Sequence, residues 1–287
     1  MTLAQHNNSR ALLATCVAAA ARAAEIIQRG AAARYSLTWE LKSPTDFVSD
    51  VDRDSERAIA EVVAQRHPGA RLLGEELSPS MAERDGIVFI ADPLDGTTNF
   101  LHGVPSYAVS IAALLDGELA AGVVLNAANG ELFTATAGGG ARRNGEPISA
   151  SSIADPSRAL IGTGFPFKDP QHIERYLASL PALMREVAGI RRPGAAALDL
   201  ADVACGRFDA FWELSLAPWD IAAGILLIRE AGGTITNLEG ESCRVEQTGV
   251  VAGNSAMHRW LIDRVGDGEG GRRRAQLTKG AADEGRS

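Results

Sequence analysis

One stretch of the sequence, residues 86–100, constrains the fold more than any other. It reads Gly-Ile-Val-Phe-Ile-Ala-Asp-Pro-Leu-Asp-Gly-Thr-Thr-Asn-Phe. Ile87 to Ala91 form an unbroken apolar run rich in β-branched and aromatic side chains, which predicts a buried strand. The strand ends on Asp92, and Asp95 follows three positions later. Carboxylates hold hard cations, and backbone amides at a helix start hold the oxygens of an anion. We therefore expect a metal and phosphate site at the end of this strand.

The same stretch has a simpler interpretation as a turn. Asp-Pro and Asp-Gly pairs are ordinary turn chemistry, and the two acids and the glycine taken alone favour a structural turn. The choice between the two interpretations depends on what else the chain contains.

The composition describes a globular protein with a large apolar core. The chain has 287 residues, of which 46% are hydrophobic, enough for one large domain or two coupled ones. The formal charge is −8, and there is no long basic stripe, which argues against nucleic-acid binding as the main function. The three cysteines lie far apart without Cys-x-x-Cys spacing, so neither a disulfide frame nor a zinc knuckle is expected. A cytoplasmic location fits best.

Membrane attachment is not expected either. Residues 10–21 faintly resemble a signal peptide, with one charge before a short apolar run. However, Arg22 and Glu25 continue a helical pattern, and Asn8 or Ser9 is suited to cap the start of that helix. We expect a first helix of the core rather than a leader or a membrane span.

The rest of the chain divides into two halves of different character. Residues 105–136 contain apolar runs broken at Asp116-Gly117 and Asn129-Gly130, which predicts an antiparallel meander with tight turns. The second half alternates, with strands expected over 159–164 and 208–213 and helices over 171–187, 195–205 and 218–231. Asp220 then falls in the first turn of the last helix.

These patterns predict an α+β half joined to an α/β half. The expected division is residues 1–152 with the metal and phosphate site, residues 153–265 with the substrate residues, and a disordered tail over residues 266–287.

Three motifs in order connect the chain to a known family. They are Gly74-Glu75-Glu76, the run from Asp92 to Phe100, and Trp219-Asp220-Ile221-Ala222-Ala223-Gly224. With them the chain resembles the inositol monophosphatase family, from about residue 10 to about residue 264. The resemblance implies the layered αβαβα sandwich of the sugar phosphatases, which include fructose-1,6-bisphosphatase. It also implies a homodimer.

The resemblance implies a role for each matching position. The main-chain carbonyl of Leu94 and four acids match the metal ligands: Glu75, Asp92, Asp95 and Asp220. The catalytic positions are Glu75 with the pair Asp52 and Thr97, which orients the attacking water. Contacts to the substrate are implied for the following residues: Leu94, Asp95, Gly96, Thr97, Arg191, Gly194, Ala196, Glu213 and Asp220.

The implied reaction is hydrolysis of myo-inositol monophosphate, or of a similar small phosphate monoester, by metal-activated water. Two cations about 3.5–4 Å apart can neutralise charge at both ends of an in-line displacement. Oxygen ligands without histidine or cysteine select Mg²⁺ or Mn²⁺ over zinc. The family implies two Mg²⁺ ions, a weaker third served by Glu75, substitution by Mn²⁺ and inhibition by Li⁺.

Other interpretations remain open at this point. In haloacid-dehalogenase phosphatases one residue separates the two acids, whereas Pro93 and Leu94 intervene here. Within the family the substrate could be fructose 1,6-bisphosphate, histidinol phosphate or a 3′-phosphoadenosine nucleotide. Ala217 stands where many bacterial relatives carry a basic residue, which leaves the preferred alcohol open. A regulatory protein-binding relative with little catalytic role is the remaining alternative.

Overall fold

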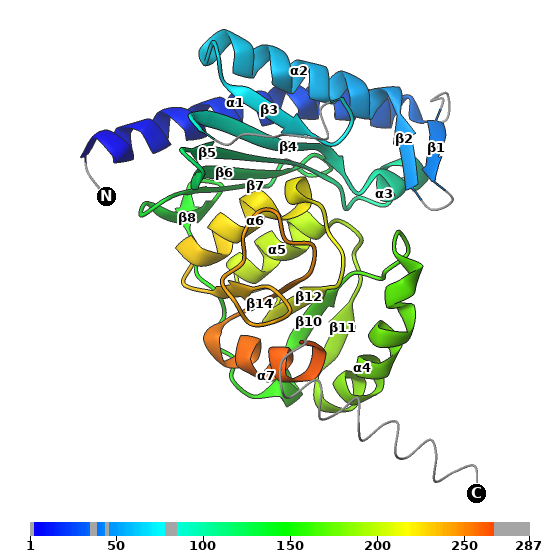
Figure 1. The fold of residues 1–287 in the computed structure, drawn as a ribbon. Helices are drawn as coiled ribbons and strands as arrows, with labels where there is room; N and C mark the ends of the chain where they lie inside the picture. The colour runs from blue at the N-terminus through cyan, green and yellow to red at the C-terminus, as the bar shows by residue number, and fades with distance from the viewer. Residues whose placement is uncertain (1–2, 35–38, 44–45, 78–84, 267–287) are drawn as a thin grey trace, which may run out of the picture.

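The computed structural model describes residues 3–34, 39–43, 46–77 and 85–266, and it stacks them in five alternating layers of helix and sheet (Figure 1). The helices are α1 Leu3–Ala32, α2 Asp50–Arg66, α3 Thr97–His102, α4 Ile173–Glu186, α5 Ala196–Ala204, α6 Pro218–Glu230 and α7 Ser255–Val265. The strands up to β7 are β1 Trp39–Ser43, β2 Asp46–Ser49, β3 Arg71–Gly74, β4 Ile87–Asp95, β5 Ala108–Leu115, β6 Glu118–Asn126 and β7 Leu132–Thr136. The later strands are β8 Gly140–Arg143, β9 Glu146–Pro147, β10 Leu160–Thr163, β11 Gly189–Arg191, β12 Ala210–Glu213, β13 Thr234–Thr236 and β14 Val250–Gly253.

The first sheet has seven strands in the order β3-β4-β5-β6-β7-β8-β9. β3 runs parallel to β4, and each later neighbour is antiparallel. The β5–β6–β7 segment confirms the predicted meander. Its first turn places Asp116 at φ 51° and Gly117 at φ 84°, as a two-residue hairpin turn with two left-handed positions requires.

Helices α1 and α2 cover the outer face of this sheet (Figure 1). α1 begins at Leu3, so the predicted cap at Asn8 or Ser9 is wrong: both residues lie inside the helix. By length and composition α1 could span a membrane, but Cys16, Ala20 and Ile27 are fully buried in the core shared with the sheet. This helix therefore belongs to the protein interior, as predicted.

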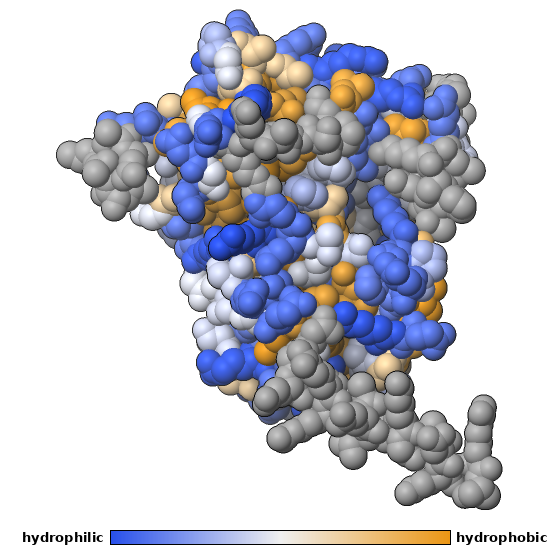
Figure 2. All heavy atoms as spheres, in the orientation of Figure 1, coloured by the Kyte–Doolittle hydropathy of each residue, from blue (hydrophilic) through white to orange (hydrophobic). Residues whose placement is uncertain are grey.

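The second sheet has five strands in the order β11-β10-β12-β14-β13. β10 is parallel to both of its neighbours, whereas β14 is antiparallel to β12 and β13. α5 and α6 lie between the two sheets, and α4 and α7 cover the far side (Figure 1). Polar side chains cover much of the face seen in Figure 2, with apolar ones showing between them.

The layered αβαβα class is thus confirmed. The division of the chain at residue 152 stays a prediction, since α5 and α6 from the second half pack against the first sheet as well as the second. Of the predicted tail, residues 267–287 lie outside the described residues.

Candidate metal and phosphate site

A break in the register of β4 brings the two acids of the central motif to the same side. Side chains alternate along a strand, so two residues separated by three positions would normally face opposite ways. The pairing of β4 with β5 shifts between Asp92 and Asp95, and the Leu94 amide donates to Asp92 Oδ1 at 2.9 Å within this turn. A bulge of this kind re-aims a side chain. Both carboxylates therefore point into one site.

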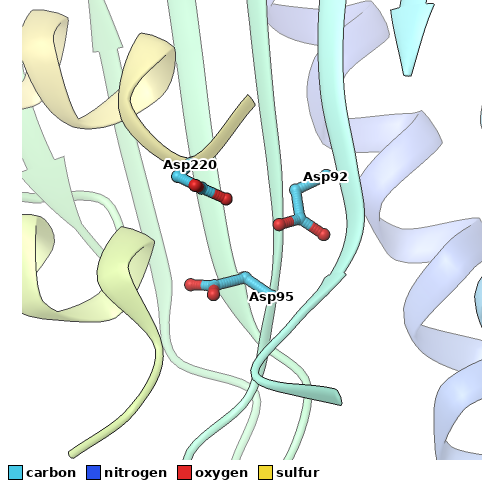
Figure 3. A group of neighbouring side chains, drawn as sticks. All are labelled: Asp92, Asp95 and Asp220. Carbon is cyan, nitrogen blue, oxygen red and sulfur yellow. The ribbon is translucent and has the colours of Figure 1, made fainter. Parts of the chain in front are cut away.

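Asp220 completes a group of three carboxylates (Figure 3). It lies in the first turn of α6, where its Oδ2 accepts a hydrogen bond from the Ala217 amide at 2.7 Å. One oxygen from each of Asp92, Asp95 and Asp220 lies within 4.8 Å of the others. Residues that are remote in the sequence thus converge on a space that one cation could fill.

Glu75 faces the same pocket from the turn that follows β3. This turn is held by Glu56, a buried residue of α2 whose carboxylate accepts the amides of Glu76 at 2.6 Å and Leu77 at 3.0 Å. Gly74 makes the approach possible, because a Cβ at this position would lie 2.2 Å from Glu56 Oε1. Glu75 is thereby placed beside β4, although it is not part of the three-carboxylate group.

The electrostatics of the group favour a bound cation. Burial, followed by the charges of Glu75, Asp95 and Asp220, raises the pKa of Asp92 well above its usual value. Burial and then the charge of Asp220 raise the pKa of Asp95 to about 8, and burial and then Glu75 raise the pKa of Asp220 to about 6. Buried like charges of this kind call for positive charge between them. The oxygen-only donor set fits a hard divalent ion.

Asp52 and Thr97 meet next to this group. Thr97 Oγ1 lies 3.0 Å from Asp52 Oδ1 and 3.0 Å from the Leu94 carbonyl oxygen. Asp52 Oδ2 accepts both the amide of Ser49 at 2.9 Å and its hydroxyl at 2.6 Å. Asp52 is therefore held at both oxygens, and the Ser49-x-x-Asp52 spacing that holds it is a capping box readable in the sequence.

The acids line a pocket of about 460 Å³, which we call the acidic pocket. Its lining also includes three of the predicted substrate residues, Gly194, Ala196 and Glu213. Arg191 is not among the lining residues; it is exposed on β11, and its guanidinium donates to the adjacent Ile190 carbonyl. The next residue, Arg192, lines the pocket instead.

The motif order and this geometry agree with a comparison across protein families. A model described as the inositol monophosphatase family matches residues 8–268. The chain belongs to the inositol monophosphatase family. The resemblance inferred from the three motifs is therefore confirmed.

Proteins with several names are similar to this chain. The inositol-1-monophosphatase of Rhizobium meliloti is 46% identical over 85% of this chain and 92% of its own. The Nus factor SuhB of Pseudomonas aeruginosa is 41% identical over 88% and 95%. The crystal structure of the extragenic suppressor protein SuhB from Bartonella henselae has a TM-score of 0.85 at 42% identity, covering 89% and 98%. The structure of inositol monophosphatase from Anabaena has a TM-score of 0.79 at 32% identity.

Inositol monophosphatase motifs do not account for every residue at the pocket. Phe165 and Phe167 form part of its lining, and the Arg192 guanidinium lies 5.7 Å and 5.2 Å from their ring centroids. Lys168 and Asp199 also line it. These four residues do not fall in any recognisable sequence motif, so the sequence did not identify them as part of the site. For Glu56 the signal was equally weak, because one acid among several on an amphipathic helix resembles a solvated residue.

Proposed function

We propose that the chain is a cytoplasmic, Mg²⁺-dependent phosphoric monoester hydrolase acting on myo-inositol monophosphate and similar small phosphate esters. One observation carries the proposal: three carboxylates from β4 and α6 line the acidic pocket, and one oxygen of each lies within 4.8 Å of the others. Membership of a metal-dependent phosphatase family supports it.

Four acids and one carbonyl would hold the cations. Asp92, Asp95 and Asp220 share one space, and Glu75 adds a carboxylate from the turn after β3. Leu94 of β4 also lines the pocket, and its carbonyl oxygen lies 3.0 Å from Thr97 Oγ1. Cations bound there supply the positive charge that a phosphate monoester dianion and its poor alkoxide leaving group require. Two Mg²⁺ ions, a weaker third at Glu75, replacement by Mn²⁺ and inhibition by Li⁺ are part of the proposal.

Asp52 and Thr97 would orient the attacking water. The hydroxyl of Thr97 donates to Asp52 Oδ1 at 3.0 Å, which leaves its lone pairs to accept a proton of the water. Ser49 fixes Asp52 from the other side, so the pair is set before a substrate arrives. Preorganisation of this kind lowers the barrier because no group must be reoriented during the reaction.

The phosphate and the alcohol would occupy opposite parts of the pocket. The amides of Gly96 and Thr97 would receive the phosphate oxygens at the start of α3, next to Leu94 and Asp95. Gly194, Ala196, Glu213 and Asp220 would contact the alcohol. Since Arg192 lines the pocket and Arg191 does not, we assign the basic contact to Arg192.

The test is phosphate release from inositol 1-phosphate, measured with Mg²⁺ and with excess EDTA. Asp95→Asn and Asp220→Asn each remove one carboxylate charge from the group. Asp202→Asn, on α5 outside the pocket, is the matched control, since its carboxylate pairs with Arg207 at 3.0 Å. We expect activity in wild type and the control only with Mg²⁺. Full activity in EDTA, or in either site variant, would refute the assignment.

Which phosphate ester the enzyme prefers is decided by comparing the substrates of the family. The relative SaIMPase-II is 26–27% identical to this chain and has been solved with inositol monophosphate and with 2′-AMP. A panel of inositol 1-phosphate, fructose 1,6-bisphosphate, histidinol phosphate and a 3′-phosphoadenosine nucleotide, compared by kcat/KM, decides between them. We expect inositol 1-phosphate to rank first, because Glu213 offers a carboxyl to ring hydroxyls.

A second candidate function is regulatory protein binding, favoured by relatives named Nus factor SuhB at 37–41% identity. A catalytically inactive Asp95→Asn chain that rescues a deletion strain would support it. Failure to rescue, with rescue by wild type, would favour the enzyme. The homodimer implied by the family is checked separately by light scattering.

A further inference from the structure

Asp199 is a buried acid with an oxygen that no group in the described residues pairs with. It lies on α5 and is 2% exposed. Its Oδ1 forms no hydrogen bond within the part of the chain that the structure describes. Buried polar atoms nearly always have a partner, and leaving one unpaired costs free energy. An orphaned carboxyl therefore needs an explanation.

The helix directs Asp199 toward the acidic pocket. Residues three apart share a helix face, and Ala196 and Asp199 both line the pocket. Leu200, the next residue, packs against α6 instead. The packing is so close that a Cβ added at Gly224 would lie 2.7 Å from the Cβ of Leu200. Asp199 thus lies at the boundary between the core and the pocket.

A second buried carboxyl, that of Glu213, lies near Asp199 in the lining of the same pocket. Glu213 is the last residue of β12, and its negative charge adds to burial in raising the pKa of Asp199. Its carboxyl comes so near the chain that a Cβ at Gly164 would lie 2.0 Å from it. Neither acid forms an ion pair with any residue in the described ranges. The guanidinium of Arg192 lies over the rings of Phe165 and Phe167 and forms no ion pair with either acid.

Two neighbouring carboxyls can recognise hydroxyl groups in a way that one cannot. Burial raises the pKa of both Asp199 and Glu213 well above the usual range, which favours the protonated form. A protonated carboxyl both donates and accepts hydrogen bonds, and so does an alcohol. Sites that offer buried polar groups to a substrate hydroxyl reject analogues without it, because those groups then stay unpaired.

We propose that Asp199 is a specificity residue of the phosphatase, which with Glu213 hydrogen-bonds the hydroxyls of the alcohol half and so favours polyhydroxylated rings over simple alcohols. This inference rests on the proposed function. The two can be tested separately. The metal and phosphate part of the site binds every ester in the same way, whereas Asp199 contacts only the alcohol.

The test compares two substrates that differ in the alcohol. Inositol 1-phosphate carries ring hydroxyls, and phenyl phosphate carries none. We expect Asp199→Ala to lower kcat/KM for inositol 1-phosphate about tenfold to a hundredfold, mainly through KM, as loss of a hydrogen bond to a carboxyl predicts. The kcat/KM for phenyl phosphate stays within about threefold of wild type.

Two further variants sharpen the comparison. Asp199→Asn keeps the shape and both kinds of hydrogen bond, and we expect it to restore most of the preference for inositol 1-phosphate. Asp202→Asn lies one turn further along α5, outside the pocket, and should leave the ratio of the two kcat/KM values unchanged. Because Asp199→Ala removes no hydrogen bond to the described protein, its Tm should not fall.

The outcomes separate the two proposals. Wild-type activity on both esters with Mg²⁺ supports the proposed function, and no activity on either overturns both proposals. With both esters hydrolysed, an equal loss on the two substrates in Asp199→Ala overturns the specificity assignment, as does an unchanged ratio. A variant that fails to fold while Asp199→Asn folds with an unchanged ratio would show that the carboxyl is structural, which also overturns it.

Discussion

The amide of Ala197 donates a hydrogen bond to Asp95 Oδ2 at 2.8 Å, joining residues 102 positions apart in the chain. Asp95 ends β4 of the seven-stranded sheet, and Ala197 lies in the first turn of α5, between the sheets. The bond orients one oxygen of a site carboxylate, and it also fixes the substrate-side helix to the metal side. A change that keeps this bond but removes the charge of Asp95 should therefore affect the site without loosening the fold.

Asp95→Asn tests this separation. The amide side chain can still accept from Ala197, while one buried negative charge is removed from a group whose members raise one another's pKa. We expect Tm to stay equal or rise, and kcat/KM for inositol 1-phosphate to fall at least about a hundredfold, since loss of a ligand should cost no less than loss of the groups that support one. Thermal unfolding and phosphate release check the two parts. A variant that loses stability in step with activity would contradict it.

Glu56→Ala tests how Glu75 is positioned. The substitution leaves the partly buried amides of Glu76 and Leu77 without their acceptor, so we expect the free energy of unfolding to fall by about 2 kcal/mol. Activity should fall about tenfold to a hundredfold, because the turn that carries Glu75 is released. Glu61→Ala, on an exposed position of the same helix, is the control and should change neither quantity. Unchanged activity in Glu56→Ala would show that the turn holds itself.

Gly96→Ala tests the turn between β4 and α3. Gly96 has φ 88°, and a Cβ would lie 2.8 Å from the Ser106 carbonyl oxygen. Gly130 has φ 80° but nothing within 4 Å of its added Cβ, so Gly130→Ala carries the same backbone strain without the contact. We expect a loss of about 1–3 kcal/mol at Gly96 from strain and contact together, and a smaller loss at Gly130. Equal losses, measured by urea unfolding, would exclude the contact with Ser106.

The pH dependence of stability should include a contribution from His258. Burial lowers the pKa of this residue below 6.5, and its Nε2 lies 2.9 Å from Thr236 Oγ1. As the pH falls, the unfolded chain therefore takes up a proton on this imidazole at a higher pH than the native protein does. The contribution of His258 to the free energy of unfolding is complete above pH 6.5 and is lost as the pH falls below that value. His258→Gln should flatten this part of the curve of unfolding free energy against pH. The same substitution at the exposed His102 separates this effect from general loss of an imidazole, and an unchanged curve in His258→Gln would contradict the assignment.

The sequence predicted the parts of the fold that local patterns encode. The meander of β5 to β7, the apolar run of β4 and the helices α4, α5 and α6 follow from periodicity and turn residues. β11, β13 and β14 were not predicted, because strands of three or four residues depend on pairing with distant strands. The start of α1 at Leu3 was missed because Asn8 and Ser9, good capping residues, are tolerated inside a long helix that is stabilised by packing.

The same distinction applies to the site. The motif acids could be located by resemblance, and the structure brings Asp92, Asp95 and Asp220 together. The residues that support or extend the site could not be located from the sequence. Glu56, Asp199 and Arg192 make their contacts only after α2, α5 and β11 have packed in the folded protein. The shift from Arg191, the last residue of β11, to Arg192 just after it shows that one position decides whether a side chain lines the pocket.

The most direct test of the account is an anomalous difference map from crystals grown or soaked with Mn²⁺. The account predicts a peak among the carboxylates of Asp92, Asp95 and Asp220, with Glu75 at its edge, and the loss of that peak in Asp95→Asn crystals treated in the same way. A map without a peak among these acids, from protein that releases phosphate from inositol 1-phosphate under the same conditions, would contradict it.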